Sequence, residues 1–167
     1  MVCAVIDIGS NTVRMSVYEY SGGRIEPLIN KKYMAGLISY VKDGRLTGRG
    51  MDKACGILES FYGILKNFKI ENIYVFATAS LRNVDNTKEA QEYIEKKTGF
   101  RIDVLSGEEE ARLDFKGATC CIDYSDGLLV DIGGGSTELV VFKDRTIISM
   151  ASMPIGSLNM FNEKVKK

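Results

Sequence analysis

Two stretches of this sequence match each other: AVIDIGSNT at residues 4–12 and LLVDIGGGS at residues 128–136. Each is an apolar run that reaches an aspartate, Asp7 or Asp131, and then enters a turn of small residues. This pattern is typical of a buried strand followed by a tight turn. The copies lie further apart than the units of a solenoid, so the repetition predicts two related domains rather than a repeat array.

A meander of three strands is predicted around each copy. Residues 12–20 and 24–33 have the character of return strands after the first copy. Residues 137–142 and 146–153 repeat this arrangement after the second copy. The duplication therefore extends beyond the turns to the strands that follow them.

Between the two meanders the apolar spacing changes to that of helices alternating with short strands. Three helices are expected, the first capped by Thr47, the second by Asn86 with Glu89, and the third by Ser106 with Glu109. Apolar strands are expected between these helices, at residues 73–77 and 101–105. This order indicates an α/β protein with a mixed sheet and flanking helices.

The composition excludes several classes of function. The 167 residues include no histidine, which removes Ser-His-Asp and Cys-His catalysis and leaves a carboxylate as the leading candidate for a general base. Lys plus Arg and Asp plus Glu number 22 each, so no net positive field indicates nucleic acid as a partner. No apolar run approaches the ~20 residues that cross a bilayer. We expect no membrane partner, no signal peptide, and a cytoplasmic protein whose four cysteines are reduced and packed as small hydrophobic residues.

The two turns are the segments best suited to bind phosphate. Small residues let backbone N–H groups approach an anion without an obstructing Cβ, and successive N–H groups form an anion nest. Asp7 and Asp131, just before the turns, are well placed to hold a metal ion or its water shell beside a phosphate chain. For either turn alone, an ordinary hairpin that uses glycine for its geometry is an equal alternative. Two matching copies favour the functional interpretation.

Four motifs occur in order along the chain: Asp7-x-Gly9-Ser10-Asn11, Thr78-Ala79-Ser80-Leu81-Arg82, Ser106-Gly107-Glu108-Glu109-Glu110-Ala111-Arg112, and Asp131-Ile132-Gly133-Gly134-Gly135-Ser136-Thr137-Glu138-Leu139. Together they resemble the exopolyphosphatase and guanosine pentaphosphate phosphatase (Ppx/GppA) family of the actin-like, sugar-kinase-like superfamily. The resemblance implies an actin-like (ribonuclease H-like) α/β fold. Residues 1–122 would form a complete first half, and residues 123–167 the opening β-meander of a second half.

The resemblance also implies that Glu110 is catalytic, orienting or deprotonating the water that attacks the terminal phosphorus. A structural interpretation competes, because acids in the first turn of a helix are stabilised by its dipole. That interpretation suits Glu109, which occupies the capping-box position, and Glu108 as a solvated neighbour. It does not by itself require Glu110.

Further site residues follow from the same resemblance. Glu138 matches a second important acid, which the resemblance implies is catalytic. With Asp7 and Asp131 it would also hold Mg²⁺ or another divalent cation and water, although a strand residue can simply alternate between surface and core. Arg82 matches a phosphate clamp, since guanidinium groups bind phosphate oxygens in pairs, and a solvated loop arginine is the alternative. The expected phosphate-binding residues are Gly9, Ser10 and Asn11 on one wall, Gly133, Gly134, Gly135, Ser136 and Thr137 on the other, and Arg82.

The implied reaction is metal-dependent hydrolysis of a phosphoanhydride, releasing orthophosphate from inorganic polyphosphate or guanosine pentaphosphate. Two other classes stay open: an actin-like ATPase or sugar-kinase-type phosphotransferase, and a non-catalytic binding or assembly module. In the family a second half continues beyond the length of this chain. The expected partner of the second meander is therefore the missing carboxy-terminal half or a second copy of the chain in a homo-oligomer.

Overall fold

The computed structural model describes residues 1–120 and 123–164. Contacts among its residues divide the chain into two compact units, Met1–Val104 and Leu105–Lys167, each with its own sheet.

The first unit is built on a five-stranded mixed sheet with the order β3-β2-β1-β6-β7. Its strands are β1 (Val2–Ile8), β2 (Thr12–Ser21), β3 (Arg24–Met34), β6 (Asn72–Ala77) and β7 (Asp103–Val104). Strands β1 to β3 form the predicted antiparallel meander, and β6 joins β1 in parallel. A parallel pair needs a long crossover connection, and the chain passes from β3 to β6 through η1 (Leu37–Tyr40), β4 (Val41–Lys42), β5 (Arg45–Leu46) and α1 (Gly48–Asn67).

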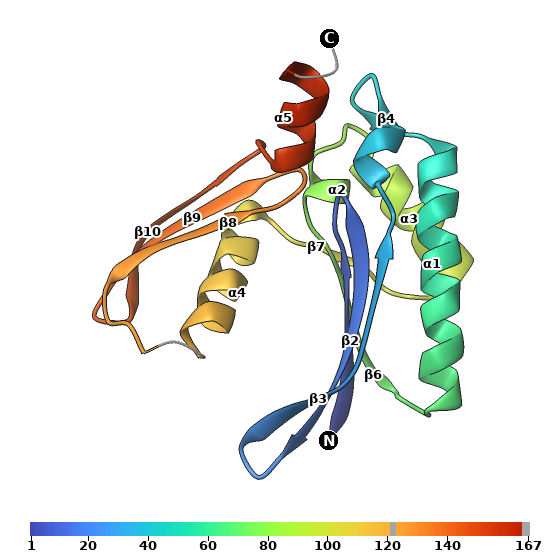
Figure 1. Cartoon of the computed structure of the whole chain (residues 1–167). Coiled ribbons are helices and arrows are strands. Elements are labelled where there is room, and N and C mark those ends of the chain that lie inside the picture. The colour runs from blue at the N-terminus through green and yellow to red at the C-terminus, as the bar shows by residue number, and fades with distance from the viewer. Residues whose placement is uncertain (121–122, 165–167) are drawn as a thin grey trace. The chain divides into compact units, whose positions relative to one another are not determined.

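Helices α1 and α3 (Thr87–Thr98) cover the same face of this sheet (Figure 1). Ile6 and Met15 of the sheet share one core with Leu58 and Phe61 of α1 and with Ile94 of α3, and all five side chains are fully buried. The helical spacing of apolar residues in α1 thus predicts its buried face. Two apolar residues of this segment, Tyr62 and Phe68, are exposed.

The predicted helix caps have different outcomes. Thr47 caps α1, its hydroxyl accepting from Gly50 N. The capping box expected at Asn86 is wrong, because the carboxamide of Asn86 pairs with the edge strand β5 instead. Leu46 N donates to Asn86 Oδ1 at 2.8 Å, and Asn86 Nδ2 donates to Leu46 O at 3.0 Å. The expected partner, Glu89, forms an ion pair with Arg45.

The second unit contains a three-stranded antiparallel sheet with the order β10-β9-β8. Its elements are α4 (Gly107–Thr119), β8 (Gly127–Ile132), β9 (Thr137–Lys143), β10 (Thr146–Met153) and α5 (Ser157–Lys164). Helix α4 packs on one face of the sheet, where Ala111 and Phe115 meet Val140 and Phe142, and the two phenylalanine rings lie 5.1 Å apart. The second meander was predicted; its covering helix was not.

This packing moves the boundary between the units. The sequence predicted a division between residues 122 and 123, but α4 contacts β9 and β10, so the units divide between Val104 and Leu105. Ile122, the predicted end of the first half, lies outside the described residues.

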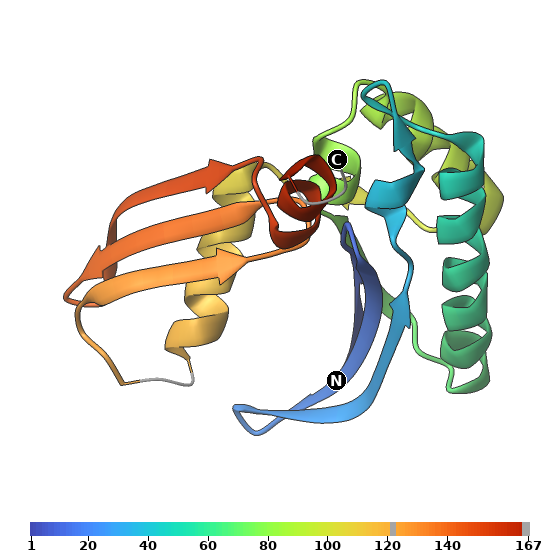
Figure 2. The same cartoon turned by 45° about the horizontal axis from the view of Figure 1, so that its top comes forward.

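The face of the second sheet opposite α4 is apolar and exposed within this chain. Leu128, Val130 and Ile132 alternate along β8 and are 60%, 48% and 64% exposed, and Val141 of β9 is 46% exposed. Figure 2 shows α4 on one side only of these three strands. The second unit therefore covers one of its two apolar sheet faces.

Among the described cysteines, Cys3 and Cys55 are free thiols. Cys55 is packed as expected, and its burial raises the pKa of the thiol. Cys120 is exposed, which corrects the expectation for that residue, and Cys121 lies outside the described residues. No described helix combines the length and the apolar character needed to cross a bilayer.

Candidate functional site

The first turn joins β1 to β2 and is closed by a backbone hydrogen bond from Gly9 N to Thr12 O at 2.9 Å. A Cβ on Gly9 would lie 3.0 Å from that carbonyl oxygen, tighter than most Cβ contacts. The carbonyl of Ser10 is held by Ile38 N at 3.0 Å. Glycine at position 9 thus allows the backbone to approach the carbonyl of Thr12 closely, and η1 supports the turn through its hydrogen bond to Ser10.

The second turn joins β8 to β9 and repeats this construction. Gly133 N donates to Ser136 O at 2.9 Å, and Leu158 N donates to Gly134 O at 3.0 Å. A Cβ on Gly133 would lie 3.3 Å from Ser136 O. Helix α5 therefore supports the second turn in the way that η1 supports the first.

The internal duplication predicted from the sequence is therefore present in the hydrogen bonding of both turns. In each case the carbonyl oxygens accept from a segment that follows the third strand of the meander. The N–H groups of Ser10, Asn11, Gly134 and Ser136 find no acceptor among the described residues. Successive N–H groups, such as those of Ser10 and Asn11, can bind an anion.

Arg82 lies at the same end of the sheet as the first turn. It ends α2 (Ala79–Arg82), which follows β6, and β6 runs parallel to β1 so that both strands terminate there. The hydroxyl of Ser80 and the N–H of Thr78, the latter at 3.5 Å, both donate to Ile8 O at the end of β1. The first unit thus brings the half-buried Arg82 to the end of the sheet where the first turn begins.

In the second unit, a row of polar side chains crosses the sheet beside the turn. Glu138 on β9 lies directly opposite Asp131 on β8 and Ser152 on β10, and residues directly opposite one another share a face. Glu138 is only 1% exposed. Its carboxylate accepts from Ser152 Oγ at 2.8 Å and from Ser136 Oγ at 3.3 Å. Two hydroxyls therefore hold a buried carboxylate at the turn.

The start of α4 packs against this row. A Cβ on Gly107 would lie 2.3 Å from the Cβ of Ser152, so only glycine fits there. Glu110, three residues further on, shares a helix face with Gly107 and is half-buried, whereas Glu108 and Glu109 are exposed. The second unit therefore brings the turn of helix that bears Glu110 to the same face as Glu138.

Glu109 forms the predicted capping box. Its carboxylate accepts from Ser106 N at 2.8 Å, and the hydroxyl of Ser106 accepts from Glu109 N at 3.2 Å. The hydrogen bonds from the backbone and side chain of Ser106 lower the pKa of Glu109 below its ordinary value. The carboxylate of Glu109 is therefore engaged in capping α4.

Asp7 and Asp131 are exposed one residue before the end of their strands, Asp7 opposite Arg14 and Asp131 opposite Glu138. Like charges directly opposite one another in a sheet are unfavourable, and a cation would offset this repulsion between Asp131 and Glu138. No group of three or more acidic or cysteine side chains able to hold a metal occurs among residues 1–120 and 123–164. The two carboxylates of Asp131 and Glu138 fit Mg²⁺, which commonly binds one or two carboxylates together with waters and substrate phosphates.

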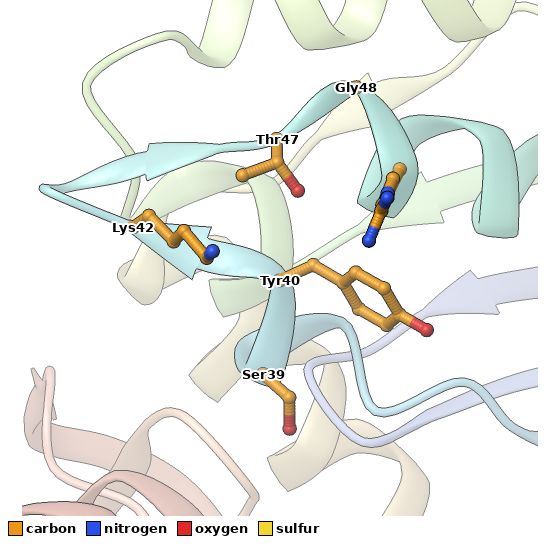
Figure 3. Close-up of a pocket in the computed structure, with 6 residues that line it drawn as sticks. Ser39, Tyr40, Lys42, Thr47 and Gly48 are labelled. Carbon is orange, nitrogen blue, oxygen red and sulfur yellow. The ribbon is translucent and has the colours of Figure 1, made fainter.

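A separate pocket of about 600 Å³ lies in the first unit and is lined by Ser39, Tyr40, Lys42, Thr47, Gly48 and Arg49 (Figure 3). Figure 3 shows the ammonium of Lys42 and the hydroxyl of Thr47 directed into the space that Tyr40 borders. Its lining carries two cations and no carboxylate. None of the predicted site residues lines it.

Several residues that shape the turns were missed by the sequence interpretation. Ser80 donates to Ile8 O at the end of β1, and Ser152 donates to Glu138 beside the second turn. Asn159 donates to Gly135 O within the second turn. Ser152 could have been found by pairing the predicted strands of the second meander. Asn159 carries no local signal, because its importance depends on the return of α5 to the turn.

Comparisons with known proteins agree with this architecture. A family model described as the Ppx/GppA phosphatase family matches residues 16–167. Exopolyphosphatase 1 of Mycobacterium tuberculosis is 31% identical over 167 residues, an alignment that covers 98% of this chain and 48% of that protein. This chain spans about half the length of the curated relatives it matches.

Solved structures give the same result. The exopolyphosphatase from Cytophaga hutchinsonii matches with a TM-score of 0.92 and 27% identity, covering 99% of this chain and 54% of that chain. MreB5 of Spiroplasma citri bound to ADP matches with a TM-score of 0.51 and 18% identity over 99% of this chain and 55% of that one, a likeness of fold alone. The predicted actin-like α/β fold class is confirmed.

Proposed function

The chain belongs to the Ppx/GppA phosphatase family, and from that premise we propose that it serves the hydrolysis of phosphoanhydride bonds, releasing orthophosphate from inorganic polyphosphate. Guanosine pentaphosphate, which carries the same type of bond, is the second substrate that we propose. The exopolyphosphatase relatives support the first of these more directly.

One observation carries the proposal: the same hydrogen bond closes both turns, Gly9 N to Thr12 O and Gly133 N to Ser136 O, directly after Asp7 and Asp131. Polyphosphate offers a binding site little except charged phosphate oxygens. Backbone N–H donors and cations can hold such a ligand without a pocket for a base or a sugar. We expect each turn to bind phosphate, as the duplicated sequence predicts.

We assign Glu110 the role of orienting or deprotonating the attacking water. The chain has no histidine, so a carboxylate is the leading candidate for this proton transfer. Glu109 is committed to its capping box, and Glu108 is exposed. Arg82 would bind phosphate oxygens in the first unit. The residues Gly9, Ser10, Asn11, Gly133, Gly134, Gly135, Ser136 and Thr137 would bind through their turns.

A divalent cation, Mg²⁺ in our proposal, would be held through Asp7, Asp131 and Glu138. When bound, it would neutralise charge on the phosphate chain. Glu138 would act as an oriented carboxylate, since the hydroxyls of Ser136 and Ser152 fix both of its oxygens. Positioning and electrostatics supply most of the catalysis in phosphoryl transfer.

We further propose that the exposed apolar face of β8, β9 and β10 is covered in the working protein, by a further part of the polypeptide or by a second copy of the chain. Exposed apolar patches of this kind commonly mark an interaction site.

The test is release of orthophosphate from long-chain polyphosphate, guanosine pentaphosphate and ATP, with and without Mg²⁺. We expect Mg²⁺-dependent release from polyphosphate and loss of that release in Glu110→Gln. Faster turnover of ATP than of polyphosphate would instead support the actin-like ATPase or kinase alternative. Tight tripolyphosphate binding without any release would support a non-catalytic binding module.

A further inference from the structure

The second turn is held from behind by the first residues of α5. Ser157 N donates to Gly133 O at 2.9 Å, and Leu158 N donates to Gly134 O at 3.0 Å. The hydroxyl of Ser157 also donates to Gly133 O at 3.1 Å. These bonds fix the carbonyl side of the first two glycines.

The loop before α5 packs directly on the turn. A Cβ on Gly156 would lie 2.5 Å from the carbonyl carbon of Gly134 and 2.6 Å from Gly135 N. No side chain fits at this position unless the turn moves. The position of this loop therefore determines the position of the turn.

Asn159 is the side chain that joins the turn, the loop and the helix. Its Oδ1 accepts from Gly156 N at 2.6 Å and from Met160 N at 2.9 Å. Its Nδ2 donates to Pro154 O at 2.9 Å and to Gly135 O at 3.4 Å. Three of these hydrogen bonds lie within the segment that supports the turn, and the fourth reaches the turn itself.

In the first turn, backbone N–H groups bind the carbonyl that corresponds to Gly135 O. The residue equivalent to Gly135 is Asn11, and its carbonyl accepts from Ala35 N and Gly36 N, each at 2.8 Å. In the second turn, a side-chain amide reaches this third carbonyl. The second turn therefore adds a side-chain contact at a position where backbone N–H groups hold the first turn.

We propose that Asn159 is a positioning residue of the phosphate site: its carboxamide holds the second turn in the shape that presents its N–H groups to phosphate. The inference rests on the proposed function for its ligand and on hydrogen bonds within the second unit for its geometry. Preorganised donors bind and stabilise charge better than donors that must reorganise. Asn159 itself touches no substrate in this account.

Three variants separate the contributions of Asn159. Asn159→Ala removes all four bonds. Asn159→Asp keeps the acceptor for the two N–H groups and favours the start of a helix, but it loses both donated bonds. Asn162→Ala is the matched control, because Asn162 is an exposed asparagine on the same helix.

The first measurement is amide hydrogen exchange of the 167-residue chain without ligand. In Asn159→Ala, exchange at Gly133 and Leu158 should rise by about tenfold or more, because their hydrogen bonds open with the turn. Gly9 and Ile38, which make the equivalent bonds in the first turn, should not change. Asn159→Asp should show a smaller increase, and Asn162→Ala none. Unchanged exchange at Gly133 in Asn159→Ala would overturn the inference whatever the ligand is.

The second measurement is the affinity of the same proteins for tripolyphosphate with Mg²⁺, at a temperature where each is folded. Loss of a supporting side chain should weaken binding by about 10- to 100-fold. If Asn159 merely stabilises the fold, the melting temperature should fall while the affinity of the folded protein stays at the wild-type value, which would overturn the positioning role. Failure of the wild type to bind tripolyphosphate would overturn the proposed function instead, and the exchange result would still decide whether Asn159 holds the turn.

Discussion

Glu108, Glu109 and Glu110 are neighbours in sequence and differ in what surrounds them. Glu109 is bonded to Ser106 at the helix start, Glu108 is exposed, and Glu110 is half-buried on the helix face that it shares with Gly107. The capping role of Glu109 could be read from sequence spacing, since a capping box is local. The face of Glu110 could not, because it depends on where α4 packs.

Substitution of Glu110 tests its assignment. In the active protein, Glu110→Gln should lower turnover of polyphosphate by roughly 10²- to 10⁴-fold, the usual contribution of a positioned base. Binding of tripolyphosphate and the melting temperature should stay close to wild type. Glu108→Gln is the matched control and should leave turnover unchanged. Equal losses in the two variants would contradict the assignment.

Glu109 should give α4 a pH-dependent stability. Its folded-state pKa is lowered by the hydrogen bonds from Ser106, so its contribution is present above the ordinary glutamate pKa of about 4.3 and is lost as the pH falls through the lower folded-state value. Glu109→Gln should therefore destabilise the protein slightly at pH 7 and have little effect near pH 3. Denaturant unfolding at both pH values measures this. A larger effect of the substitution at the lower pH would contradict the capping role.

Asn86 shows where local spacing fails. It has the same spacing to Glu89 as Ser106 has to Glu109, yet its carboxamide bonds to the backbone of Leu46, 40 residues away. A cap and a strand edge compete for the same side chain, and the edge contributes both a donor and an acceptor. Only the tertiary structure reveals this competitor.

At the scale of elements, the repeated meander is the feature that the sequence predicts best. Strand alternation and the turn residues are local signals, and each strand pair forms as expected. The assignment of α4 to the first half failed for a physical reason: the apolar spacing of Ala111 and Phe115 identifies a buried face but not the sheet that buries it. That sheet is formed by residues later in the chain.

The contact between the α5 loop and the second turn is open to direct test. Gly156→Ala should displace the turn, because the added Cβ has no space beside Gly134 and Gly135, and it should destabilise the second unit by about 1–3 kcal/mol as other overpacked sites do. Gly117→Ala is the control, since that helix position of α4 has nothing within 4 Å and should be neutral or stabilising. Thermal unfolding compares the two. Equal stability of Gly156→Ala and wild type would contradict the close approach.

At the scale of the whole molecule, the apolar face of the second sheet should govern association. Burial of apolar surface contributes roughly 25 cal/mol per Å². Association that buries the face containing Leu128, Val130 and Ile132 is therefore favourable. Sedimentation of this chain should show concentration-dependent self-association that Val130→Lys reduces. Phe68→Ser, which removes an exposed aromatic residue at the end of α1, should not reduce it. A wild-type chain that stays monomeric at all concentrations would contradict this expectation.

We propose that both duplicated turns bind phosphate. The most direct measurement is an NMR titration of the amide signals with tripolyphosphate and Mg²⁺. We expect the amides of residues 9–12 and those of residues 133–137 both to shift. Shifts confined to one turn, or to the pocket lined by residues 39–49 in Figure 3, would contradict it.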